Sequence, residues 1–136
     1  MKYVNPPTIA PPIGKFSHVV LAPSSTTMAY ISGQIGVGAD GALDSDSCYD
    51  QTKQTFANLE MVLEHLRVTP ASIVKMLTLV VGEDGFAEFA RARDEVYARW
   101  FPGGQYPAHS AATVTALAKP RLRVEIEAVV AIPSPS

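Results

Sequence analysis

The clearest alternation of apolar and polar residues in this 136-residue chain lies near its C-terminal end. Alternation with a period of two predicts a strand with one buried face. That face would consist of Leu122, Val124, Ile126, Ala128 and Val130. The opposite face carries Arg123, Glu125 and Glu127, spaced about 6.6 Å apart along the strand. This charged row is either a solvated sheet surface or part of a binding site.

The segment before this strand, His109 to Leu117, is made almost wholly of small residues. We interpret it as a partner strand, joined to the alternating strand by a turn at Lys119 and Pro120. Small side chains would let another backbone, a ligand or a neighbouring subunit approach closely.

Five further elements follow from the same patterns. Strands are predicted over Phe16–Leu21 and Met28–Ile35, and a buried strand over Ile73–Val81. Apolar residues at helical spacing predict one helix over Ser47–Leu66 and another from Asp84 or Gly85 to about Trp100. The expected order is therefore β-β-α-β-α-β-β.

This order predicts an α+β fold in a single domain, residues 1–136, with residues 1–12 as an extended, proline-rich N-terminal arm. Two helices are too few to cover both faces of such a sheet. We therefore expect one face to be solvated or buried against other subunits.

Composition narrows the function classes. The chain has 11 basic and 13 acidic residues and no basic run, so we expect no nucleic-acid partner. Its only cysteine, Cys48, allows no internal disulfide and no paired-thiolate metal site. The proline-rich start is unlike a signal peptide, and no apolar stretch approaches membrane-spanning length. We expect a cytoplasmic protein with no membrane partner, no metal and no cofactor.

Four segments, in the same order along the chain, resemble motifs of the RidA/YjgF superfamily of imine and enamine deaminases. Residues 10–17, APPIGKFS, are similar to the opening A-P-x-x-I-G-P-Y-S, and residues 30–36, YISGQIG, to I-S-G-Q-I-G. Residues 73–81, IVKMLTLVV, resemble V-V-K-x-T-V-x-L. The stretch from Tyr106 to Ala128 resembles the C-terminal F-P-A-R-S/A, L-P-K and I-E-I-E-A series.

The resemblance implies a chorismate-mutase-like fold, in which a mixed, mostly antiparallel six-stranded sheet carries two helices on one face. It also implies a homotrimer around the other face, with ligand sites between subunits. Archetypal members hydrolyse imino acids to the keto acid and ammonia, so a small-molecule metabolite is the implied partner.

Three residues match the family's site. Glu125 corresponds to the glutamate that delivers or activates water, and Ser32 with the Gly33 backbone corresponds to the polar end of the site. Two residues depart from it: His109 stands where an arginine grips the substrate carboxylate, and Phe16 replaces a tyrosine.

A third departure is Asp94, at the position of an asparagine, which would add negative charge if it faced the cleft. A mostly neutral histidine offers fewer donors than arginine, so small imino acids should bind poorly. Either His109 acts as an acid or base, with its pKa raised by Glu125, or it is a hydrogen-bonded residue at a subunit contact. Arg123 either binds an anion or pairs with Glu125 or Glu127.

The remaining candidates favour structural roles. His18 and His65 suit surface or packing positions. Cys48 lies near a helix start, where a thiolate would be favoured, but no partner motif accompanies it.

Three functions stay open at this point. The chain is a diverged deaminase of an enamine or imine larger than aminoacrylate, or a trimer that binds a metabolite without turnover. Ribonuclease action, an old label for some relatives, is disfavoured by the acidic balance and the absence of a paired-histidine motif. Whether the chain is an enzyme is left undecided by the sequence.

Overall fold

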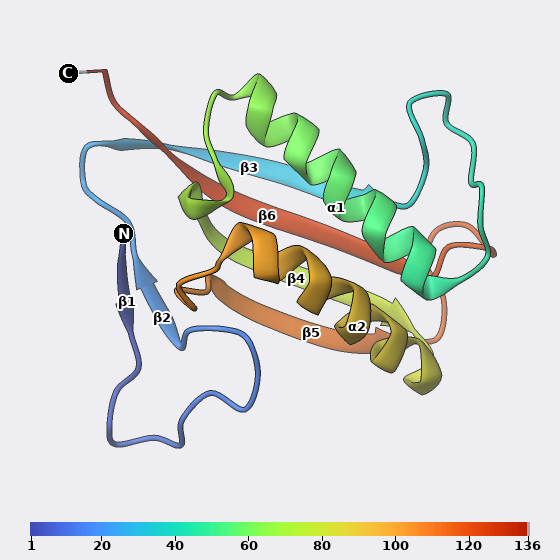
Figure 1. The fold of residues 1–136 in the computed structure, drawn as a ribbon, viewed down its shortest axis with the longest axis horizontal. Coiled ribbons are helices and arrows are strands. Elements are labelled where there is room, and N and C mark those ends of the chain that lie inside the picture. Colours follow the sequence, from blue (N-terminus) through green and yellow to red (C-terminus); the bar gives the residue numbers. More distant parts are fainter. Residues whose placement is uncertain (136) are drawn as a thin grey trace.

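The computed structural model describes residues 1–135. Its elements follow the order β1 (Lys2–Val4), β2 (Val19–Leu21), β3 (Thr26–Ile35), α1 (Cys48–His65), a short 3₁₀ turn (Pro70–Ser72), β4 (Ile73–Val81), α2 (Glu83–Trp100), β5 (Ala108–Val114) and β6 (Val124–Pro133). The predicted α+β fold is confirmed (Figure 1). The proline-rich arm contributes β1, which pairs antiparallel with β2.

The main sheet has the strand order β3-β6-β4-β5. β6 runs antiparallel to β3 and β4, and β4 runs parallel to β5. The sheet is therefore mixed and mostly antiparallel, as expected. The six strands nevertheless divide into two sheets, because β1 and β2 form a separate pair.

The expected partnership between the two C-terminal strands is wrong. β4 lies between β5 and β6, and α2 is the crossover that places β5 parallel to β4. A parallel neighbour needs such a crossover, whereas a turn alone joins only antiparallel neighbours. The chain between β5 and β6 is thus a connection across β4.

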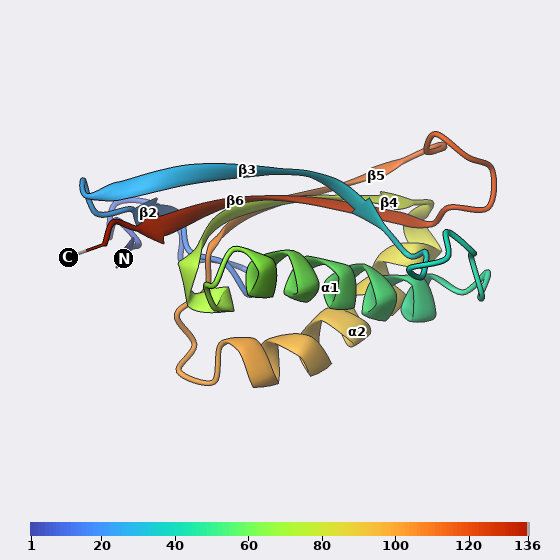
Figure 2. The same ribbon diagram turned by 90° about the horizontal axis from the view of Figure 1, so that it is seen from above.

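Both helices cover the same face of the main sheet (Figure 2). The core between the layers includes Phe56, Leu59 and Leu63 of α1, and Phe89 and Tyr97 of α2, all almost fully buried. The predicted inner face of β6 is confirmed, since every residue of the expected apolar row from Leu122 to Val130 is buried.

The other face of the main sheet carries no helix (Figure 2). We call it the open face; by register it includes Tyr30, Leu77, Leu79, Glu125, Glu127 and Val129. Tyr30 is 78% exposed, which is unusual for a large aromatic residue on a sheet. This is the face that we expected to be solvated or buried against other subunits.

The helix boundaries agree with the sequence to within a residue or two. The Ser47 side chain caps α1 by accepting a hydrogen bond from the backbone N–H of Asp50 at 2.9 Å. Over residues 1–135, neither helix combines the length and hydrophobicity needed to cross a bilayer.

Candidate functional site

The carboxylate of Glu125 lies directly over the backbone of Gly33. The register of β3 against β6 shifts between Ile31 and Gln34, so Ser32 and Gly33 form a β-bulge there. A Cβ atom on residue 33 would lie 2.7 Å from Cδ and 2.8 Å from Cγ of Glu125. Only glycine leaves room for the carboxylate in this position. Glu125 and Gly33 therefore meet on the β3–β6 pair, with Ser32 in the same bulge.

The start of β6 is fixed by Gln51, a buried residue of α1. Its Oε1 accepts a hydrogen bond from the backbone N–H of Arg123 at 2.7 Å, and its Nε2 donates to the Arg121 carbonyl at 3.0 Å. Because Glu125 follows two residues later on the same strand, the helix layer holds the backbone that carries the carboxylate.

Replacing Gly33 with alanine is expected to displace the Glu125 carboxylate, and at a reacting centre a misplacement of about 1 Å lowers the rate by about 10- to 100-fold. The free energy of unfolding should change by less than about 1 kcal/mol, because the displaced group is the end of a half-exposed side chain. Gly103→Ala is the control, since nothing lies within 4 Å of its added Cβ. Equal activity of the two variants would contradict the close approach.

His109 points away from Glu125, toward the helix layer. It stands level with buried Met76 in the parallel β4–β5 pair and shares its face. Its Nε2 is hydrogen-bonded to Oγ1 of Thr78 at 2.8 Å, and its Nδ1 to the hydroxyl of Tyr97 at 3.2 Å. The Phe89 ring packs edge-on against it, with centroids 6.4 Å apart.

These surroundings keep the His109 imidazole neutral. Burial, with a smaller contribution from the Arg93 charge, lowers the pKa of His109 to about 4. The expectation that Glu125 raises this pKa is wrong, because the carboxylate lies on the opposite face of the sheet. The alternative of a histidine with satisfied hydrogen bonds agrees with both ring contacts.

Phe16 and His109 meet at a cavity of about 220 Å³ beside the start of β5. The chain there runs along β5 because the Ser17 N–H donates to the Pro107 carbonyl at 3.1 Å and its hydroxyl to the Tyr106 carbonyl at 2.7 Å. The cavity is lined by Phe16, Ser17, His18, Lys75, Ala108, His109 and Ser110.

Asp94 of α2 adds no uncompensated negative charge near this cavity. Its Oδ1 lies 3.4 Å from Nζ of Lys15 and 3.1 Å from Nη2 of Arg93. Neither Lys15 nor Arg93 was predicted from the sequence as a site residue. The signal for Lys15 was available, since it stands where the family opening has proline, whereas nothing local distinguished Arg93.

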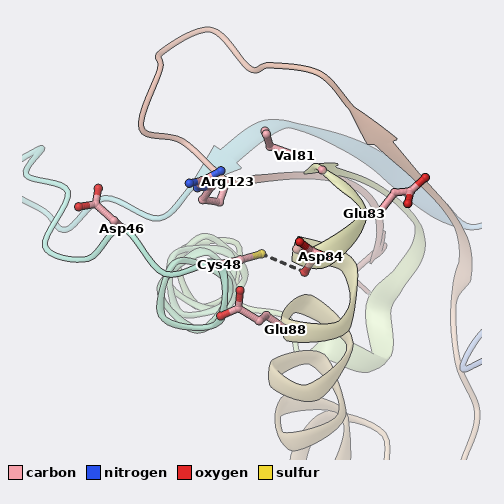
Figure 3. A pocket seen from close by; sticks show the side chains of 9 residues that line it. Asp46, Cys48, Val81, Glu83, Asp84, Glu88 and Arg123 are labelled. Atoms are coloured by element: carbon pink, nitrogen blue, oxygen red, sulfur yellow. Dashed lines mark hydrogen bonds between the residues drawn. The ribbon is translucent and has the colours of Figure 1, made fainter.

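Arg123 belongs to a different cavity, of about 480 Å³, at the start of α2 (Figure 3). Four of its nine lining residues are acidic: Asp46, Glu83, Asp84 and Glu88. Over residues 1–135 no ion pair joins Arg123 to Glu125 or Glu127, so that expectation is wrong. Among the same residues, no three histidine, cysteine or carboxylate side chains gather as a metal site would require.

Cys48 lies between the two helices at this cavity (Figure 3). It is 3% exposed, its Sγ lies 3.3 Å from the Gly85 carbonyl oxygen, and burial raises the pKa of the thiol. These contacts support the structural role expected for Cys48 over a thiolate.

Apart from Arg123, the candidate residues thus fall into two groups within one chain. The first group, Ser32, Gly33 and Glu125, lies on the β3–β6 pair. The second group, Phe16 and His109 with Asp94 nearby, lies at the free edge of β5. β4 separates the groups, and Glu125 and His109 face opposite sides of the sheet.

The family model described as "Endoribonuclease L-PSP" matches residues 8–132, nearly the whole chain. The chain belongs to the RidA/YjgF superfamily. It is 31% identical over 119 residues to the RutC family protein PH0854 of Pyrococcus horikoshii, covering 87% of each chain.

Solved structures of RidA/YjgF relatives share the fold. YyfB of Yersinia pestis, described as a Rid family protein of unknown function, aligns with a TM-score of 0.82 and 33% identity over 96% of this chain and 98% of that one. Rv2704 of Mycobacterium tuberculosis, described as a member of the YjgF/YER057c/UK114 family, aligns with a TM-score of 0.61 and 28% identity over 85% and 86%.

Proposed function

We propose that this chain hydrolyses an enamine or imine of a small metabolite to a carbonyl compound and ammonia. The observation that carries this proposal is the carboxylate of Glu125, held over Gly33 at the position of the family's water-activating glutamate. Glu125 takes a proton from water as the oxygen bonds to the C=N carbon. The same carboxyl returns that proton to the nitrogen, which gives the neutral carbinolamine; an enamine reacts as its imine tautomer. Glu125 then takes the hydroxyl proton and passes it to the nitrogen as the C–N bond breaks, so the carbonyl forms and ammonia leaves.

The two groups of candidate residues support a site between subunits. Neither face of one chain carries both groups, so a complete cleft would need a second copy. The open face offers apolar surface for such a contact at Tyr30, Leu77 and Leu79. In the proposed homotrimer, one subunit contributes Glu125 and Gly33, and its neighbour contributes the Phe16–His109 cavity.

Placing a charge on the open face should dissociate this homotrimer. Wild-type protein is expected to have a mass about three times the 14.5 kDa of the chain in light scattering, and Tyr30→Glu a mass near that of one chain. Met61→Glu is the control, because Met61 is an exposed apolar residue on α1, in the helix layer. A monomeric wild type, or a trimeric Tyr30→Glu protein, would contradict the proposed assembly.

The substrate should differ from 2-iminopropanoate, the small imino acid of archetypal members. His109 is neutral and both ring nitrogens are occupied by Thr78 and Tyr97, so it offers no bidentate cation to a carboxylate. Phe16 also has no hydroxyl to donate. A larger enamine or imine acid, bound through other contacts, fits this cleft better.

The same two residues favour one alternative, a trimer that binds a metabolite without turnover. Ammonia release measured over a panel of freshly generated imino and enamino acids of increasing size distinguishes the two functions. Release above buffer for a larger member supports the deaminase. A compound that raises the thermal midpoint but is recovered unchanged after hours would establish the binding function instead.

A further inference from the structure

A guanidinium packs over two aromatic rings that contact His109, although β5 supplies no arginine. Arg93 of α2 places its Cζ 5.5 Å from the centre of the Phe89 ring and 6.0 Å from that of Tyr97. Both rings also contact His109, through an edge-on contact and a hydrogen bond respectively. The Arg93 side chain is only 16% exposed, so water screens its charge less than that of a surface arginine.

The Arg93 guanidinium keeps donors available. Its Nε and Nη2 both approach Oδ1 of Asp94, at 3.1 Å each, so Asp94 occupies one edge of the planar group. Over residues 1–135 the Nη1 edge has no hydrogen-bond or ion-pair partner. The guanidinium therefore has a second edge, formed by Nη1 and Nη2. Its two parallel N–H donors match the two oxygens of a carboxylate.

Charge near the cavity is also unbalanced. Lys15 and Arg93 share the single carboxylate of Asp94, which leaves one positive charge over. Lys75 lines the cavity itself and has no ion pair among residues 1–135. It also lines a neighbouring cavity on the open face, where Glu127 is the only carboxylate. The surroundings of Phe16 and His109 are therefore net positive.

We propose that Arg93, held by Asp94, is the residue that binds the ligand's carboxylate in this cleft, with Lys75 adding to the positive field. The ligand class is an organic acid: the cavity of about 220 Å³ admits the carboxylate and its nearest atoms, and the rest of the larger substrate lies in the cleft outside it. The inference rests on the proposed function, because it assigns the carboxylate-binding residue of the same cleft. A carboxylate held from α2 instead of β5 would orient the reacting carbon differently toward Glu125.

The test compares pyruvate with pyruvamide, a neutral analogue of the same shape, in calorimetric titrations. Wild-type protein should bind pyruvate at least about tenfold more tightly, because a charge-assisted bidentate contact is lost in the amide. Arg93→Gln should bring this ratio close to one, and Arg93→Lys should give an intermediate ratio, since lysine keeps the charge but not the fork. Arg99→Gln, which removes a guanidinium from the same helix at its pair with Glu60, should leave the ratio unchanged.

Two results would overturn the proposal: equal binding of the two probes by the wild type, or an unchanged ratio in Arg93→Gln with a wild-type thermal midpoint. If Arg93→Gln unfolds, the Arg93→Lys ratio decides, and a fall of less than about threefold overturns the proposal. Glu125→Gln should retain the pyruvate preference. A preserved preference without ammonia release from any substrate would therefore end the deaminase proposal and leave the anion site standing.

Discussion

Replacing Glu125 with glutamine is expected to lower ammonia release by about 10²- to 10⁴-fold, the range for losing a general acid–base group. Glutamine has nearly the same shape, so it can occupy the space over Gly33, but its amide cannot take a proton from water. The fold should be unaffected, because the side chain lies on the open face and only its backbone joins the sheet. Steady-state rates with the best substrate of the panel provide the measurement.

Glu127→Gln is the matched control for this variant. Glu127 lies two residues further along β6 on the same face and is exposed. The Glu127→Gln substitution therefore removes the same charge from the same surface. Its activity should stay within about twofold of the wild type, as expected for a surface charge away from the reacting atoms. Similar losses in both variants would show that Glu125 acts through the general charge of the face, and would remove its catalytic role.

The second large effect concerns acid stability. The folded-state pKa of His109 is about 4, below the unfolded value of about 6.5, so unfolding takes up a proton as pH falls between these values. Stability from this residue is therefore complete above pH 6.5 and is lost progressively down to pH 4. Urea unfolding should show a loss of about 2 to 3 kcal/mol between pH 7.5 and pH 4.5 that is attributable to His109.

His109→Gln should remove this pH dependence even though it lowers stability at pH 7.5 by breaking contacts with Thr78 and Tyr97. Glu60 and Glu95 have lowered pKa values because of hydrogen bonds to Arg99 and Tyr49, so their contributions are lost only at more acidic pH. A wild-type slope in His109→Gln would show that the imidazole is not buried in its neutral form.

Local sequence patterns predicted the helices and strands well, but they predicted poorly which strands pair with each other. The bounds of β4 match the predicted Ile73–Val81, and α1 begins after the Ser47 cap, because burial periodicity and capping are properties of adjacent residues. The position of β5 beside β4 depends on α2 as a crossover. The pairing of β5 with β4 depends on how the strands and helices are connected. The alternation of residues within one strand carries no information about that connection.

The site shows the same division. Glu125 and Gly33 were predictable because each lies in a segment that resembles a motif of the family. The orientation of His109 was not, since β5 consists of small residues whose pattern does not separate an inner face from an outer one. Arg93 packs on Phe89 and Tyr97, which lie four residues before and after it on α2, but the contacts of these two rings with His109 are tertiary and no spacing within α2 predicts them.

The bulge at Ser32 and Gly33 also changes the phase of β3. Ile31 and Ile35 are an even number of residues apart, so a regular strand would project both from one side. Here Ile31 is buried in the core, whereas Ile35 stands opposite Glu125. Deleting either bulge residue would leave Ile31 and Ile35 an odd number of residues apart, so a regular strand would keep the partners and faces seen here. What the deletion would remove is the extra residue of the bulge, which brings the backbone of Gly33 under the Glu125 carboxylate.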